Sequence, residues 1–318
     1  MARRRRLNDH PWCDADIQGV AAARLGGKQK RHAAVIVMGM SRSGTSLTTS
    51  IITKLLNPGG GDEKTVYMGS GAPYPADHAN PNGYYERRDV ISLDYGTLRS
   101  IEKGAWYNFP PGFAQHPTLL NYSGSPSLAA HQRRAFEEKA VPILADMDKR
   151  QPWVLKDVRF ARMLPLWWPL LTAGAVCVIP YRNPLDVAAS SILHSTRVWE
   201  NYMSAALATT AALGCPTALV SYHDWTSGDA RARRQLAGLH AFLRCAGVPG
   251  LTAQPSPGVL EHAVLASATH TRDTASYQSQ LSPSVRCLWE RLRNGSALRH
   301  RPPCIVGGSS VERLGTVR

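Results

Sequence analysis

Short apolar runs alternate along the chain with longer segments whose apolar residues recur at helical spacing. The run Ala33–Met38 is typical of a strand covered on both faces of a parallel sheet, and Thr45–Leu56 has the spacing of a helix. The same alternation predicts further strands over 151–159, Ala175–Ile179 and Thr217–Ser221, and further helices over Ser127–Lys149, Phe160–Leu171, Val198–Leu213 and Ala230–Ala246. It therefore predicts an α/β fold, a three-layer sandwich with a central, mostly parallel sheet flanked by helices.

The segment between the first strand and its helix has the composition of an anion-binding loop. Gly39 and Gly44 bracket a turn that a ligand can approach closely, and the unpaired N–H groups of the following helix suit phosphate or sulfate. The spacing of the two glycines is that of a nucleoside triphosphate loop, but Thr45 stands where such a loop carries lysine. The cation lies earlier, at Arg42.

A second phosphate site is predicted where the strand ending near Ile179 leads into a helix. Arg182 follows the strand, Pro184 suits the first turn of a helix, and Asp186 complements the helix dipole. Ser190 follows Arg182 by eight positions, so we expect both side chains to face one spot and to donate to one phosphate.

A third group of polar residues, Lys156, Asp157 and Arg159, follows the apolar residues around Val154. Ligands of open α/β sheets bind outside the carboxyl ends of the strands, so we expect this group to lie near Arg182.

Four segments of the chain resemble sulfotransferases of the bacterial type, which use 3′-phosphoadenosine-5′-phosphosulfate. The segments are S-R-S-G-T-S at 41–46, N-P-N-G-Y-Y-E at 80–86, W-V-L-K-D-V-R at 153–159 and R-N-P-L-D-V-A-A-S at 182–190. The resemblance implies the P-loop NTPase-like sulfotransferase fold for a domain over 32–300. The basic composition of 1–31 predicts a disordered tail, and a second tail is expected over 301–318. Two features depart from the family. Val158 replaces the usual proline, and the R-K-G triplet of cytosolic members is missing, with Arg272 as a guess for its role.

The resemblance also implies roles for single residues. The cofactor-binding set is Arg42, Ser43, Gly44, Thr45, Ser46, Arg182, Ser190 and Tyr222, and the catalytic set is Arg42, Lys156 and Glu86. Tyr222 matches a tyrosine that packs on adenine, although packing at a strand end explains it equally well. Glu86 is the candidate base, with Asp157 as the alternative; a helix cap or a structural salt bridge is the competing interpretation of Glu86.

The implied function is transfer of a sulfuryl group from 3′-phosphoadenosine-5′-phosphosulfate to a hydroxyl of a small-molecule or carbohydrate acceptor, with no metal. One alternative is a P-loop kinase that uses ATP and magnesium, against which Thr45 argues. Another is a non-enzymatic basic protein that binds nucleic acid or a polyanionic glycan, since the formal net charge is +14. Nucleic acid is disfavoured because the basic residues are spread along the chain and form no recognisable motif.

The cysteines and the N-terminus bear on location. The six cysteines include no C-x-x-C pair, which argues against a zinc site, and we expect them to stay reduced. The basic start of the chain has no apolar segment behind it, and the stretch Met163–Arg182, which is uncharged up to Arg182, is interrupted by prolines. We therefore expect no membrane span and a cytoplasmic protein.

Overall fold

A parallel sheet of four strands, in the order β2-β1-β3-β4, forms the centre of the molecule. Its strands are β1 (His32–Val37), β2 (Trp153–Lys156), β3 (Gly174–Tyr181) and β4 (Thr217–Ser221). The structure, a computed structural model, describes residues 32–57, 66, 69–76, 80, 83–102, 130–191, 194–252, 254–255, 258–260 and 281–294. The predicted tails over 1–31 and 301–318 lie outside these residues.

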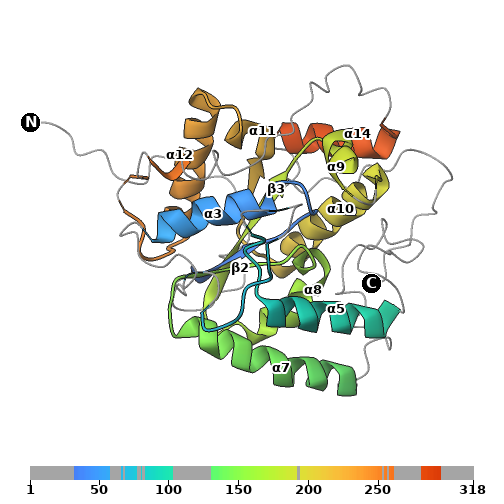
Figure 1. The fold of residues 1–318 in the computed structure, drawn as a ribbon, viewed down its shortest axis with the longest axis vertical. Coiled ribbons are helices and arrows are strands. Elements are labelled where there is room, and N and C mark those ends of the chain that lie inside the picture. The colour runs from blue at the N-terminus through green and yellow to red at the C-terminus, as the bar shows by residue number, and fades with distance from the viewer. Residues whose placement is uncertain are drawn as a thin grey trace, which may run out of the picture.

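Helices connect the strands and cover both faces of the sheet (Figure 1). They are α3 (Thr45–Leu56), α5 (Arg88–Glu102), α7 (Ala130–Asp148), α8 (Phe160–Trp167), the 3-10 turn η1 (Trp168–Leu170), α9 (Pro184–Ser190), α10 (Thr196–Leu213), α11 (Tyr222–Trp225), α12 (Ala230–Cys245) and α14 (Pro283–Arg293). The strands and helices predicted from the sequence are confirmed to within a few residues at each end.

Side-chain alternation along β1 explains the two layers of helices. Ala34 and Ile36 point into an apolar cluster that includes residues of α5, α7, α8, α10 and α14. Val35 and Val37 point into the opposite cluster, with residues of α3 and α12. Because both faces of β1 are buried, its sequence is a continuous apolar run, and this confirms the predicted α/β fold with helices on both faces.

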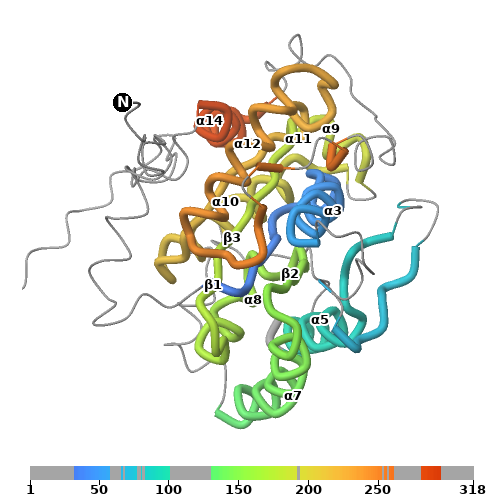
Figure 2. The backbone as a smooth tube through the Cα atoms, turned by 90° about the vertical axis from the view of Figure 1, so that its left-hand side faces the viewer, coloured from blue at the N-terminus to red at the C-terminus, as the bar shows by residue number. Residues whose placement is uncertain are grey.

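Two groups of helices lie at opposite ends of the molecule. Helices α5 and α7 lie side by side at one end, and α9, α11 and α14 lie together at the other (Figure 1, Figure 2). The sequence interpretation missed α14 and the short helix α11. Ser282 caps α14 by accepting from the Val285 N–H at 3.3 Å, and Pro283 opens it. This cap, together with buried Leu288 and Leu292 at helical spacing, is a signal that could have found the helix.

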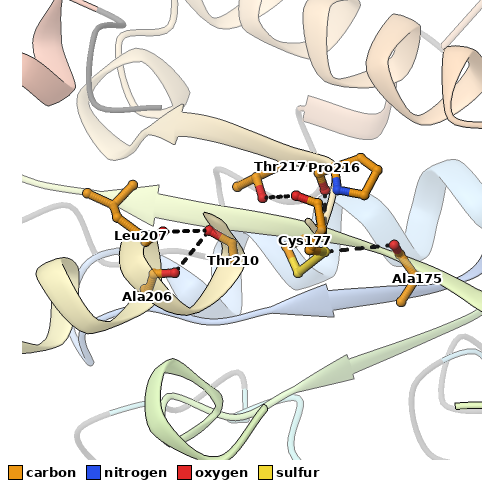
Figure 3. The surroundings of a disulfide bond; sticks show 8 residues. Ala175, Cys177, Ala206, Leu207, Thr210, Pro216 and Thr217 are labelled. Carbon is orange, nitrogen blue, oxygen red and sulfur yellow. Dashed lines mark hydrogen bonds between the residues drawn. A yellow bond between two sulfur atoms is a disulfide. The ribbon is translucent and has the colours of Figure 1, made fainter. Parts of the chain in front are cut away.

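The expectation that the cysteines stay reduced is wrong. Cys177 in β3 forms a disulfide with Cys215, which lies two residues before β4 (Figure 3). Cys245 and Cys287 are disulfide-bonded as well. The sequence gives no hint of the pair because Cys177 and Cys215 are 38 positions apart, and only the parallel pairing of β3 with β4 brings them together.

Within the described residues, no helix has the combination of length and apolar character needed to cross a bilayer. The stretch Met163–Arg182 instead contains the end of α8, the turn η1 and the strand β3, as its prolines indicated.

Candidate functional site

The loop between β1 and α3 has the backbone of an anion-binding turn. Gly39, Arg42 and Gly44 all have positive φ, of 132°, 66° and 91°. Gly44 is the N-cap of α3 and no side chain caps this end, so the first N–H groups of the helix are left for a ligand. The Ser43 hydroxyl is also buried without a hydrogen-bond partner. Both observations fit a bound anion.

Glycine is required at position 44 for two reasons. Its φ of 91° is costly for other residues, and a Cβ there would lie 2.6 Å from Cδ2 of Tyr222. Arg42 adopts positive φ without being glycine, which costs about 1 kcal/mol and is typical of strained functional loops.

The four strands end at the same edge of the sheet. Val37 of β1 pairs with Lys156 of β2 and with Val178 of β3, and Tyr181 of β3 pairs with Ser221 of β4. The predicted site residues that follow these strand ends therefore gather around the start of α3, as the rule for open α/β sheets requires.

Lys156 and Glu86 form a buried ion pair beside α3. Lys156 Nζ lies 2.6 Å from Glu86 Oε1, and it also donates to the Tyr84 carbonyl at 3.0 Å and to Ser46 Oγ at 3.5 Å. The lysine and glutamate side chains are 2% and 8% exposed. Burial raises the pKa of Glu86, while the charge of Lys156 opposes that rise. Lys156 thus links the carboxyl group of Glu86 to Ser46 in the first turn of α3.

A short strap holds Glu86 in this position. The Tyr74 N–H donates to the Glu86 carbonyl at 2.8 Å, and the Arg88 N–H donates to the Ala72 carbonyl at 2.9 Å. Between them, Arg87 forms an ion pair with Asp146 of α7 at 2.7 Å. These contacts tie the segment before α5 to α7 and fix the backbone that carries Glu86.

Asp157, the alternative base, is bound by Arg159, two positions further along the chain. Its Oδ1 accepts from both the backbone N–H and Nη1 of Arg159 at 2.8 Å, and its side chain is fully buried. Its charge contributes to the raised pKa of Glu86 and to that of Asp94, which is raised mainly by burial. In this structure Asp157 therefore orients Arg159 and tunes its acidic neighbours.

Arg182 and Tyr222 contact the other side of the loop. Arg182 Nη1 donates to the Arg42 carbonyl at 3.2 Å, and its guanidinium carbon lies 4.4 Å from the centre of the Tyr222 ring. Burial lowers the pKa of Arg182. Tyr222 is only 5% exposed, with Gly44 against its edge. The tyrosine thus packs against both the loop and Arg182, and adenine stacking stays a prediction.

Ser190 occupies the last position of α9, where its hydroxyl donates to the Val187 carbonyl at 3.2 Å. Its convergence with Arg182 on one ligand stays a prediction. Arg272, the guess for the missing triplet, lies outside the described residues.

Two neighbours of the site were not predicted. Asn80 Nδ2 donates to Ser46 Oγ at 3.0 Å, and its place at the start of the N-P-N-G-Y-Y-E segment is a signal that could have identified it. His223 Nε2 lies 3.4 Å from Asp186 Oδ2, a contact that depends on how α9 and α11 pack.

In the part of the chain that the structure describes, no group of three or more His, Cys, Asp or Glu side chains is arranged to hold a metal ion. The donors at the site are cations, hydroxyls and backbone N–H groups, which fit an anionic ligand.

No protein-family model matches the chain, and the search of curated proteins finds no significant match. The functional assignment therefore rests on the sequence segments and on the geometry of the site.

Proposed function

We propose that the protein is a sulfotransferase that moves a sulfuryl group from 3′-phosphoadenosine-5′-phosphosulfate to a hydroxyl of a small-molecule or carbohydrate acceptor. The observation that carries this proposal is the 3.2 Å contact of Arg182 with the carbonyl of Arg42. This contact connects Arg182, the cation at the end of β3, to the anion-binding loop, which has no lysine. Two linked cationic positions suit a nucleotide with phosphate groups at both the 5′ and the 3′ positions.

One group of residues would bind the nucleotide, and Glu86 would accept the proton of the acceptor hydroxyl. Arg42, Ser43 and the N–H groups at the start of α3 would hold the phosphosulfate, and Arg182 would bind near the second phosphate. When bound, the nucleotide supplies the sulfuryl group. Lys156 would neutralise charge that develops on the single oxygen between sulfur and phosphorus as its bond to sulfur breaks.

Glu86 would take the proton of the acceptor hydroxyl as its oxygen bonds to sulfur. Oε1 of Glu86 is held by Lys156 at 2.6 Å, so this role requires the ammonium group to turn toward the nucleotide. In the reaction the sulfur–oxygen bond to phosphate breaks, the bisphosphate leaves, and the proton remains on Glu86.

The location of the protein is part of the proposal. The sequence favours the cytoplasm, but disulfides are rare there and persist in oxidising compartments. The Cys177–Cys215 disulfide therefore favours an oxidising compartment.

Thermal stabilisation by ligands tests the proposal against both alternatives, because a ligand that binds the folded form raises its melting temperature. We expect adenosine 3′,5′-bisphosphate to stabilise the protein more than ATP with magnesium or duplex DNA. Stabilisation by ATP and magnesium alone would favour the kinase. Stabilisation by DNA alone would favour the polyanion-binding protein.

A further inference from the structure

Asp186 of α9 lies between two basic side chains, Arg182 after β3 and His223 of α11. Helices α9 and α11 are at the same end of the molecule (Figure 1). Asp186 Oδ2 is 4.0 Å from Nε of Arg182 and 3.4 Å from Nε2 of His223. The Asp186 side chain is only 2% exposed. Asp186 therefore brings the side chains of Arg182 and His223 to the same buried carboxylate.

The two basic groups differ in how they meet solvent. Arg182 is buried, its Nη1 is used by the Arg42 carbonyl, and its guanidinium lies over the Tyr222 ring. The His223 side chain is 29% exposed. His223 is therefore the more accessible of the two to a ligand that approaches from solvent.

The surroundings of His223 favour its neutral form in the protein alone. The ring lies near Trp289 of α14, at 6.5 Å between centroids. The charged groups that act on it are Asp186, Arg182, Asp224 and Arg231. Burial lowers the pKa of the imidazole, and the two arginines add to this effect while the two aspartates oppose it. An arriving anion would reverse the balance, because it favours the charged imidazolium.

We propose that His223 binds the 3′-phosphate of the nucleotide beside Arg182 and takes up a proton when that phosphate binds. This inference rests on the proposed function. In cytosolic sulfotransferases an R-K-G triplet contacts this phosphate, and the present sequence lacks the triplet. The proposal assigns the contact to His223 of α11 instead. The ligand group is a phosphate monoester, to which an imidazolium donates a charge-assisted hydrogen bond.

The proposal fixes the direction of a pH effect. If the pKa of His223 is higher in the complex than in the protein alone, affinity rises as the pH falls from the higher pKa to the lower one. It is constant outside that window. We expect adenosine 3′,5′-bisphosphate to bind about tenfold more tightly at the acid end, the size of one charge-assisted hydrogen bond.

The test is calorimetric titration of adenosine 3′,5′-bisphosphate between pH 5.5 and 8.5 into the wild type and His223→Gln. Because a phosphate monoester itself titrates near pH 6, the informative quantity is the difference between the two proteins. We expect His223→Gln to lose the extra affinity at low pH and the linked proton uptake. His131→Gln, an exposed position on α7, is the matched control and should behave as the wild type.

A second ligand and a second measurement separate the possible failures. Adenosine 5′-phosphosulfate lacks the 3′-phosphate, so its affinity should not respond to His223→Gln. Equal pH profiles for the wild type and His223→Gln would overturn the role of His223 and leave the proposed function standing. Failure of the wild type to bind the bisphosphate at any pH would instead overturn the proposed function. If the variant does not fold, the imidazole resonances of His223 in the wild type decide, because they must shift to the charged form on saturation at neutral pH.

Discussion

The carboxylate of Glu86 and the ammonium of Lys156 are each other's nearest charged partner in a buried site. Removing one charge from such a pair leaves the other uncompensated, whereas an amide keeps the shape and a hydrogen bond. Glu86→Gln is therefore the informative substitution, and Arg182→Ala is its counterpart at the nucleotide side.

We expect Glu86→Gln to lower turnover by about 10²–10⁴-fold, the usual contribution of a general base, while bisphosphate affinity is kept. Arg182→Ala should instead reduce the affinity for adenosine 3′,5′-bisphosphate by about 10–100-fold. Steady-state kinetics and calorimetry measure the two effects. Glu138→Gln and Arg134→Ala, from an exposed pair on α7, are the controls. Wild-type turnover in Glu86→Gln would move the base to Asp157.

The pH profile of turnover tests the same role. A base must be deprotonated to act, so turnover falls as the pH drops through the pKa of Glu86. Burial raises that pKa. We therefore expect the acid limb of the wild-type profile to lie above the ordinary glutamate pKa of about 4.3. A limb at or below that value would contradict a buried glutamate base.

The loop between β1 and α3 contacts the end of β4, because Tyr222, which follows β4, packs directly on Gly44. A side chain at position 44 would push Tyr222 and Arg182 away from the loop. The shape of the anion site thus depends on contact between two strand ends.

We expect Gly44→Ala to lower the free energy of unfolding by about 1–3 kcal/mol through backbone strain and overpacking, and to weaken bisphosphate binding. Chemical denaturation and calorimetry measure the two effects. Gly96→Ala is the matched control, since Gly96 lies on the exposed side of α5 with nothing within 4 Å of an added Cβ. It should stabilise the protein by up to about 1 kcal/mol. A Gly44→Ala variant as stable as the wild type would contradict the packing of Tyr222 on the loop.

The disulfide between Cys177 and Cys215 fastens the connection through α9 and α10 to the sheet. Closing a loop of 38 positions removes conformational entropy from the unfolded chain, which corresponds to about 4 kcal/mol. The bond joins β3 to the chain just before β4, at the opposite end of β4 from Tyr222.

We expect the double substitution Cys177→Ala with Cys215→Ala to lower the free energy of unfolding by about 2–4 kcal/mol. Urea denaturation measures it. The wild type with a reductant should lose at least as much stability, because the disulfides of Cys245 and Cys287 are then reduced as well. Thiol labelling of the unfolded, unreduced protein should leave both cysteines unmodified. Labelling of both would show that the bond does not form.

The architecture was readable from the sequence because its signals are local. The apolar run of Ala33–Met38 and the helical spacing after Thr45 predicted a strand and a helix, and the structure contains β1 and α3 at these places. The preference of ligands for the carboxyl ends of parallel strands then predicted that Lys156 and Arg182 would share an edge with the loop.

Only the tertiary structure decided which side chains meet at that edge. Lys156 pairs with Glu86 across 70 positions, and Arg182 reaches the Arg42 carbonyl across 140. The raised pKa of Glu86 likewise depends on burial by other elements. Apolar residues that recur every two positions indicate strands, and those that recur every three to four positions indicate helices, so the sequence predicts the elements themselves. Contacts between distant strand ends depend on strand order and register, which no local period specifies.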